Sequence, residues 1–234
     1  GAGRQVVVRV SKSLAELSLL TGDSITALRE YDRILQLSPG DITALSAKAS
    51  LLVRLGRYDD ALPLYDQLTE LSPGNTNFWA QMAFVLNNKG RYDEGLRSAE
   101  KAIEIDPRNS VAWNNKGTSL INLGKNEEAL EAYNQSLAIE PDNAVVWANK
   151  GYLLAFIGRY DEALEAYNRS LEIDPSQSTT WGYKANALYQ TGNFEAAIEA
   201  SDHALAADKE NYLAWVTRAH SLASSGRFND AVPA

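Results

Sequence analysis

Residues 113–175 read WNNKGTSLINLGKNEEALEAYNQSLAIEPDNAVVWANKGYLLAFIGRYDEALEAYNRSLEIDP, and this stretch contains one pattern twice. The second copy begins at Trp147, thirty-four residues after Trp113, and it keeps the glycine, alanine and proline spacing without an insertion. A fixed period of this length is typical of chains built from stacked helical or mixed units. The stretch therefore predicts a repeat array rather than one compact core.

The same period extends over most of the 234-residue chain. All five tryptophans lie on it, at Trp79, Trp113, Trp147, Trp181 and Trp215. We number each repeat so that the tryptophan takes position 4, and residues 1–7 are then a leader or a cloning scar. The predicted repeats are 8–41, 42–75, 76–109, 110–143, 144–177, 178–211 and a truncated 212–234.

Several positions of the repeat have a direct physical interpretation. Position 15 is always glycine, which predicts a left-handed residue that ends the first helix of each repeat. Positions 8 and 20 are always small, which predicts a close approach of two helices. Proline at position 32 predicts the end of the second helix. Position 34 is a predicted cap of the next first helix at Asp41, Asn75, Asn109, Asn143 and Asn211.

This pattern of W, G, Y, A, F and P resembles the tetratricopeptide repeat, and the resemblance covers residues 8–231. It implies an all-α, right-handed superhelical solenoid of antiparallel helix pairs. First helices would line a concave groove and second helices a convex face, with no active site in the array. Repeat one departs most, because Ser11 replaces the tryptophan and Ser24 replaces the usual aromatic residue. We therefore expect its first helix to be irregular.

Composition excludes several classes of function. The net charge of −8 and the sequence pI of about 4.9 argue against binding to nucleic acid or to an anionic membrane surface. The chain has no cysteine and no apolar run long enough to cross a bilayer. Neither His203 nor His220 has a metal-ligand pattern beside it, and no phosphate loop or nucleophile motif appears. We expect a cytoplasmic protein that is not an enzyme and that needs no cofactor or metal.

The helical period also predicts a binding face. At 100° per residue, positions 4, 8, 11 and 15 form a stripe that faces the core, and positions 2, 5, 6, 9 and 13 lie opposite it. Positions 3 and 10 pack against a neighbouring repeat. In repeats three to seven the set opposite the core contains no Asp, Glu, Lys or Arg, and it is rich in amides and aromatic residues. The candidate peptide-binding residues are Asn77, Gln81, Phe84, Asn88, Asn114, Asn115, Asn122, Asn149, Tyr152, Phe156, Tyr183, Asn186 and Gln190. The alternative is a solvated face that is rich in amides.

These residue types indicate the ligand. A carboxamide both donates and accepts, so it can satisfy both groups of a peptide bond, and aromatic rings add apolar contact area. We expect Asn114, Asn115, Asn122, Asn149, Tyr152 and Phe156 to be solvent-accessible. Some glycosyltransferase arrays of the family hold peptides with an asparagine ladder at position 6, where this chain has Asn115 and Asn149. The basic clamp that grips acidic tails in other members is missing, because the partner position of Lys12 is Glu16.

The sequence thus predicts a scaffold that binds an extended, largely uncharged segment of a protein or peptide partner in its groove. One alternative is a regulatory or substrate-selecting array of an enzyme whose catalytic domain lies outside this chain. Another is a structural array that self-associates, so the oligomeric state stays open.

Position 7 is basic in five repeats, which suggests an ion pair between repeats. The bases are Lys48, Lys116, Lys150, Lys184 and Arg218. Position 31 of the preceding repeat is acidic before the last four, at Asp106, Glu140, Asp174 and Asp208. We expect at least three of these four pairs to lie within ion-pair distance, about 4 Å. The alternative is that each basic side chain only lays its aliphatic stem along an apolar contact between repeats.

Overall fold

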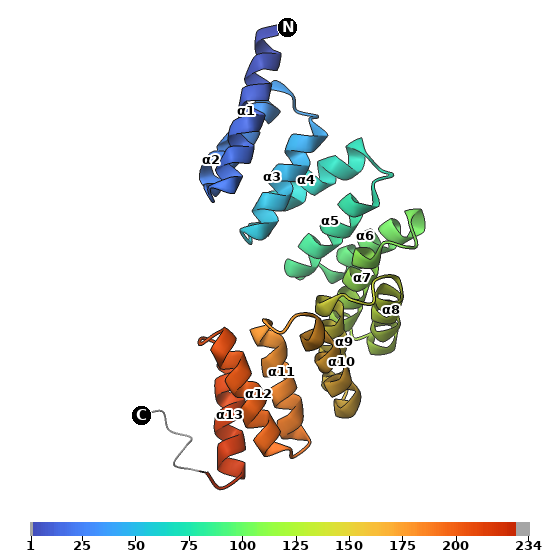
Figure 1. Cartoon of the computed structure of the whole chain (residues 1–234). Helices are drawn as coiled ribbons and strands as arrows, with labels where there is room; N and C mark the ends of the chain where they lie inside the picture. Colours follow the sequence, from blue (N-terminus) through green and yellow to red (C-terminus); the bar gives the residue numbers. More distant parts are fainter. Residues whose placement is uncertain (1, 228–234) are drawn as a thin grey trace. The chain divides into compact units, whose positions relative to one another are not determined.

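The computed structural model describes residues 2–227, which form thirteen α-helices (Figure 1). They are α1 (Ala2–Leu20), α2 (Ser24–Leu37), α3 (Ile42–Arg54), α4 (Tyr58–Leu71), α5 (Thr76–Asn88), α6 (Tyr92–Ile105), α7 (Ser110–Asn122), α8 (Asn126–Ile139), α9 (Ala144–Phe156), α10 (Tyr160–Ile173), α11 (Ser178–Gln190), α12 (Phe194–Ala207) and α13 (Tyr212–Ser224). Odd-numbered helices are the first helices of the repeats and even-numbered helices are the second.

The chain divides into two compact units, Gly1–Leu123 with α1–α7 and Gly124–Ala234 with α8–α13. In the first unit α1 packs on α2, α3 on α4, and α5 on both α6 and α7. In the second unit α9 packs on α10, and α11 packs on both α12 and α13. The fold is therefore an all-α solenoid of antiparallel helix pairs, as predicted. None of the described helices is both long and apolar enough to span a bilayer.

Glycine at position 15 ends every first helix, which confirms that prediction. All seven of these glycines have positive φ, from 68° at Gly56 to 81° at Gly158. A Cβ added at Gly158 would meet no atom within 4 Å. The demand for glycine at this turn thus comes from the backbone conformation and not from crowding.

Replacing Gly158 with alanine is expected to lower the free energy of unfolding by about 1–2 kcal/mol, because an L-residue is strained at positive φ. Gly40→Ala is the matched control, since Gly40 also has open space around it and its φ is not positive. That control should leave stability unchanged or raise it slightly. Urea unfolding followed by circular dichroism measures both variants. Equal losses in the two would contradict the role of the turn.

The predicted caps are confirmed. Asn109 Oδ1 accepts a hydrogen bond from the backbone N–H of Ala112 at 3.0 Å, and Asn143 Oδ1 does the same for Val146 at 3.2 Å. Asp41, Asn75 and Asn211 cap α3, α5 and α13 in the same way. Each cap satisfies a backbone donor that has no partner inside the helix.

The small residues at positions 8 and 20 lie at the tightest contact between paired helices, as predicted. At Gly151 in α9 an added Cβ would come within 2.6 Å of Tyr167 Cε1 and 3.2 Å of the Ala163 carbonyl oxygen. Tyr167 in α10 is fully buried and is among the largest core side chains of the second unit. The missing Cβ of Gly151 makes room for that ring.

The tryptophans differ from the prediction, which placed position 4 in the core. Trp147 is half-buried, and Trp215 is 43 % exposed. Each indole Nε1–H instead donates to the carbonyl oxygen six residues earlier, at 2.8 Å from Trp147 to Pro141. Trp215 makes the same bond, at 2.9 Å, to Lys209, which stands where the other repeats have proline. The tryptophan therefore stabilises the loop between repeats by a hydrogen bond to a backbone carbonyl oxygen. Because every residue type has this oxygen, the bond does not depend on the proline.

Repeat one is more regular than predicted. Its first helix, α1, is continuous for 19 residues and includes residues 2–7, which were assigned to a leader. Ser11, in place of the tryptophan, is buried in this helix. The predicted second helix of repeat seven, including its small residue Ala231, lies outside the described residues.

Candidate peptide-binding face

The five positions predicted to line a groove separate into two groups. Positions 2, 9 and 13 of the first helices are mostly solvent-accessible, and we call them the open face. Positions 5 and 6 lie closer to the neighbouring first helix, where Ala80, Gly182 and Thr217 are buried. Positions 3 and 10 are largely buried, as predicted, for example at Leu51, Val85, Val146 and Leu153. A single-helix projection places positions 6 and 13 at similar angles, so it could not separate these groups.

Asn115 is the clearest correction to the predicted site. Its side chain is only 3 % exposed, and its Nδ2 donates to the carbonyl oxygen of Ala80 on α5 at 2.8 Å. The expectation that Asn115 is solvent-accessible was therefore wrong. The side chain is long enough to reach the preceding first helix, and the small residue at position 80 leaves its backbone within reach.

Asn115 belongs to a buried polar network that joins α5 and α7. Asn87 Nδ2 donates to the Asn115 carbonyl oxygen at 3.0 Å, and the Ser119 hydroxyl donates to Asn87 Oδ1 at 2.7 Å. Gly95 on α6 provides the space, because a Cβ there would lie 2.4 Å from Asn87 Oδ1. Buried polar groups are stable only when they are hydrogen-bonded, so this network fixes how the two repeats pack.

The open face of the first unit is largely polar. Asn77, Asn88 and Asn122 are exposed, and Phe84 is half-buried. Asn114, which is at position 5 and not on the open face, is also half-buried. Asn88 Nδ2 donates to the Phe84 carbonyl oxygen at 2.8 Å, and Asn122 Nδ2 donates to that of Thr118 at 2.9 Å. Both amides therefore use one N–H inside their own helix. Gln81, at position 6, is half-buried.

The open face of the second unit is more apolar. On α9, Val145 is 57 % exposed, Tyr152 41 % and Phe156 65 %. The Tyr152 and Tyr183 rings lie 5.2 Å apart between centroids, which joins α9 to α11. Of the other predicted residues, Asn149, Tyr183 and Asn186 are half-buried and Gln190 is exposed. This unit therefore offers the larger accessible aromatic surface.

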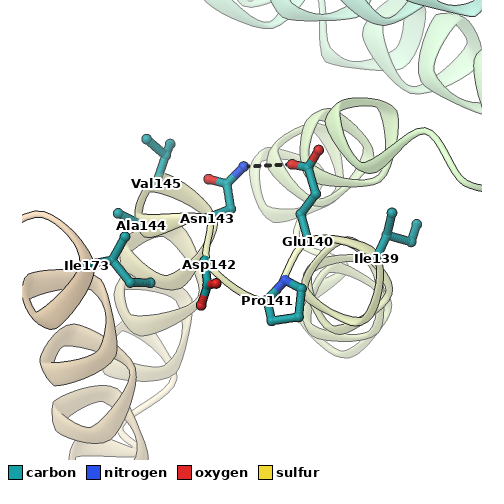
Figure 2. Close-up of a pocket in the computed structure, with 8 residues that line it drawn as sticks. All are labelled: Ile139, Glu140, Pro141, Asp142, Asn143, Ala144, Val145 and Ile173. Atoms are coloured by element: carbon teal, nitrogen blue, oxygen red, sulfur yellow. Dashed lines mark hydrogen bonds between the residues drawn. The ribbon is translucent and has the colours of Figure 1, made fainter.

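A pocket that the sequence did not indicate lies at the start of α9 (Figure 2). It has a volume of about 520 Å³ and is lined by Ile139, Glu140, Pro141, Asp142, Asn143, Ala144, Val145 and Ile173. Asn143 Nδ2 donates to Glu140 Oε2 at 3.2 Å across one wall. Val145 also belongs to the open face of α9, so the pocket adjoins that face. The signal that the sequence offered for this pocket was an apolar residue, Val145, at a position predicted to face away from the core.

The predicted ion pairs between positions 31 and 7 do not form. None of the four pairs is within ion-pair distance in the described part of the chain. Position 31 is the first residue after each second helix. At Asp106 and Asp174, the carboxylate accepts a hydrogen bond from the turn that follows. Asp106 Oδ1 accepts from the backbone N–H of Arg108 at 2.9 Å, and Asp174 Oδ1 does so from Ser176 at 3.0 Å.

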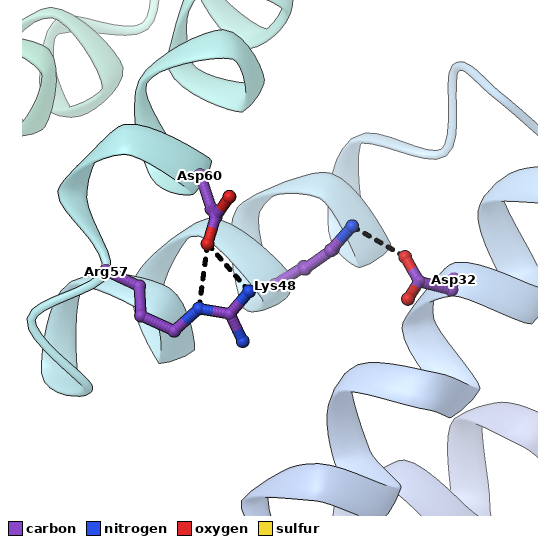
Figure 3. A network of polar contacts seen from close by, with 4 residues as sticks. All are labelled: Asp32, Lys48, Arg57 and Asp60. Carbon is purple, nitrogen blue, oxygen red and sulfur yellow. Dashed lines mark hydrogen bonds and ion pairs between the residues drawn. The ribbon is translucent and has the colours of Figure 1, made fainter.

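The basic residues at position 7 pair with position 25 of the preceding repeat. Lys48 Nζ lies 2.6 Å from Asp32 Oδ1, as Figure 3 shows beside the local pair of Arg57 and Asp60. The second and third examples are Lys116 Nζ to Glu100 Oε1 at 3.0 Å and Arg218 Nε to Asp202 Oδ1 at 2.6 Å. Each joins a second helix to the next first helix. The expectation of ion pairs between repeats was right in kind and wrong in partner.

Two repeats keep the base but lose this acid. Before Lys150 and Lys184, position 25 is Asn134 and Asn168. Burial lowers the pKa of both ammonium groups, partly offset by Glu162 for Lys150 and by Glu199 for Lys184. Each ammonium lies over the tryptophan three residues earlier, at 5.1 Å from the Trp147 ring centroid and 4.8 Å from that of Trp181.

The described residues contain no group of three or more His, Cys, Asp and Glu side chains that could hold a metal ion. The arrangement of the open face suits hydrogen bonding and apolar contact with an extended chain.

Comparison with known proteins agrees with the repeat pattern. Three family models, each described as a tetratricopeptide repeat, match the chain: one at residues 108–176, one at 18–83, 52–114 and 157–202, and one at 184–234. No curated protein sequence matches the chain.

Solved structures share the fold at low sequence identity. PilW, a type IV pilus biogenesis factor, is 19 % identical with a TM-score of 0.77, over 90 % of this chain and 97 % of its own. MamA is 17 % identical with a TM-score of 0.62, and the match covers 74 % of this chain and 94 % of MamA. YrrB, described as a TPR protein with an unusual peptide-binding site, is 23 % identical with a TM-score of 0.57, over 80 % and 97 %.

Proposed function

Because the chain belongs to the tetratricopeptide-repeat family, we propose that it is a protein-interaction scaffold that binds an extended, largely uncharged peptide segment on the open face of its second unit. The observation that carries the proposal is the exposure of Val145, Tyr152 and Phe156 on one face of α9. Large rigid side chains of this kind are the usual anchors of binding surfaces. No catalytic step is assigned to this chain.

The absence of charge on this face supports an uncharged ligand. At positions 2, 9 and 13 of α9, α11 and α13 the side chains are aliphatic, aromatic, amide, hydroxyl or imidazole groups. A charged ligand group would lose its hydration here without gaining an opposite charge. Asn186 and Gln190 can donate to and accept from a peptide backbone, and the pocket beside Val145 has room for one apolar side chain.

The YrrB comparison supports the proposal in a general way only. That protein is described as binding a peptide at an unusual site, and its likeness to this chain is one of fold.

The test begins with selection of binding peptides from a random displayed library against the whole chain. We expect the selected peptides to contain apolar residues and few charged ones. The double variant Tyr152→Ser and Phe156→Ser should bind them about tenfold more weakly or worse, because it removes the two aromatic anchors. Its midpoint of thermal unfolding should fall only by the few degrees that loss of the ring contact between Tyr152 and Tyr183 causes, since Phe156 is 65 % exposed.

Leu71→Ser is the matched control. Leu71 is also an exposed apolar residue, at the end of α4 and away from the open face. It should leave binding unchanged. If the double variant binds as tightly as the unchanged protein, the peptide lies elsewhere and the proposed site is wrong.

A further inference from the structure

Where the ion pair between positions 25 and 7 forms, a carboxylate lies beside the basic residue at the junction between two repeats. In three junctions the acid comes from the chain itself, through Asp32, Glu100 and Asp202. The base then lies 2.6–3.0 Å from a carboxylate oxygen. At Lys184 the same place is next to Asn168, whose carboxamide is neutral and supplies no opposite charge.

The junction at Lys184 is also open to a ligand. A pocket of about 340 Å³ lies there, lined by Leu164 and Asn168 of α10, Trp181, Lys184 and Leu188 of α11, and Ala196, Glu199, Ala200 and His203 of α12. First-helix residues thus share the pocket with residues of two successive second helices. It involves none of the open-face positions 2, 9 and 13, so it is separate from the proposed peptide site.

The polar groups of this pocket are suited to an anion. Lys184 is half-buried, and no carboxylate oxygen of the described residues lies within ion-pair distance of it. His203 stacks on Trp181 with 4.5 Å between ring centroids and 22° between planes. Asn168 and His203 can each donate a hydrogen bond beside the ammonium group. Glu199 is the one acidic residue of the lining, and its negative charge opposes an incoming anion and so weakens binding.

We propose that this pocket binds the side-chain carboxylate of an aspartate or glutamate residue from a partner protein, with Lys184 as its counter-ion. The incoming carboxylate takes the place that Asp202 holds beside Arg218 and Glu100 beside Lys116. A side chain is assigned as the source because all three internal examples are side chains that reach across between helices. Partly buried, charge-assisted hydrogen bonds of this kind are stronger than neutral ones.

The tryptophans provide a direct readout. Each indole N–H gives its own signal in a nitrogen–proton NMR spectrum, and Trp181 lies in the pocket. The probe is the blocked peptide acetyl-Gly-Glu-Gly-amide, added to the whole chain at constant ionic strength. We expect a saturable shift of the Trp181 signal. Trp113 is the internal control, because Lys116 beside it already pairs with Glu100.

Three further probes identify the group that binds. Acetyl-Gly-Gln-Gly-amide has the same shape without the charge and should leave Trp181 unmoved. Acetyl-Gly-Gly-Gly with a free carboxyl terminus should bind less well than the glutamate peptide. Inorganic phosphate should also bind less well. A response to the glutamine peptide equal to that of the glutamate peptide overturns the proposal, and a stronger response to either of the other two overturns the assignment to a side-chain carboxylate.

Two variants test the residues. Lys184→Gln should weaken binding of the glutamate peptide about tenfold or more, because it removes the charge-assisted bond. Asn168→Asp should weaken it by a similar factor by restoring the internal acid, and this variant keeps the shape of the side chain. Unchanged binding of the glutamate peptide in both variants would contradict the proposal. Neither result bears on peptide binding at the open face, which the Tyr152 and Phe156 variant tests.

Discussion

Replacing Trp147 with alanine is expected to lower the local free energy of unfolding by about 3 kcal/mol, within the range for large aromatic residues. The ring packs against the buried cluster of Leu154, Ala163 and Tyr167. Its Nε1–H holds the Pro141 carbonyl oxygen, and Lys150 lies over its face. Half-exposure of the ring keeps the loss near the lower end of the range.

The loss should be confined to the neighbouring helices, because solenoid stability comes from contacts between adjacent repeats. Hydrogen exchange resolved by residue is therefore the measurement, since a repeat array need not unfold in one step. The amides of α9 and α10 should lose the most protection.

Two control variants separate the contributions of this side chain. Trp147→Phe keeps an aromatic ring but removes the N–H, and it should cost about 1 kcal/mol for the lost hydrogen bond. Trp215→Ala should cost less than Trp147→Ala, because that ring is 43 % exposed. A loss below about 1 kcal/mol for Trp147→Ala would mean that the ring contributes no packing.

Replacing Asn115 with alanine is expected to cost about 2–3 kcal/mol, because a buried hydrogen bond between two helices and the packing of the side chain are lost together. The Ala80 carbonyl oxygen loses the bond from Asn115 Nδ2, and a small void opens between α5 and α7. The effect should appear as increased hydrogen exchange in both helices.

Asn88→Ala is the matched control for this variant. Asn88 also donates to a backbone carbonyl oxygen, at 2.8 Å, but it is exposed to solvent. Water replaces that bond, so the variant should change stability by less than about 0.5 kcal/mol. Similar losses in the two variants would show that burial of the Asn115 network contributes nothing.

The parts of the fold that sequence could predict are local and repeated. Glycine at position 15 needs only a positive φ, and Asn109 caps α7 with a bond that spans three residues. Such features depend on their own neighbours in the chain, and six or seven copies make the pattern unambiguous. The helix pairs and their boundaries follow from them.

The parts that sequence could not predict depend on which side of a helix meets another helix. Lys116 has an acid ten residues earlier, at Asp106, and another sixteen residues earlier, at Glu100. Spacing alone does not tell them apart, and only packing brings Glu100 to 3.0 Å. Asn115 was misplaced for the same reason, because a projection of one helix does not include the neighbour that covers it.

The contact between Gly95 and Asn87 makes the two residues depend on each other. Position 20 is alanine in other repeats, as at Ala61, Ala129 and Ala163, and Gly95 is an exception. An alanine Cβ at residue 95 would lie 2.4 Å from Asn87 Oδ1 in its present conformation, so the amide would have to move away from the Ser119 hydroxyl that it accepts from. The effects of substitutions at the two positions are therefore coupled and not additive.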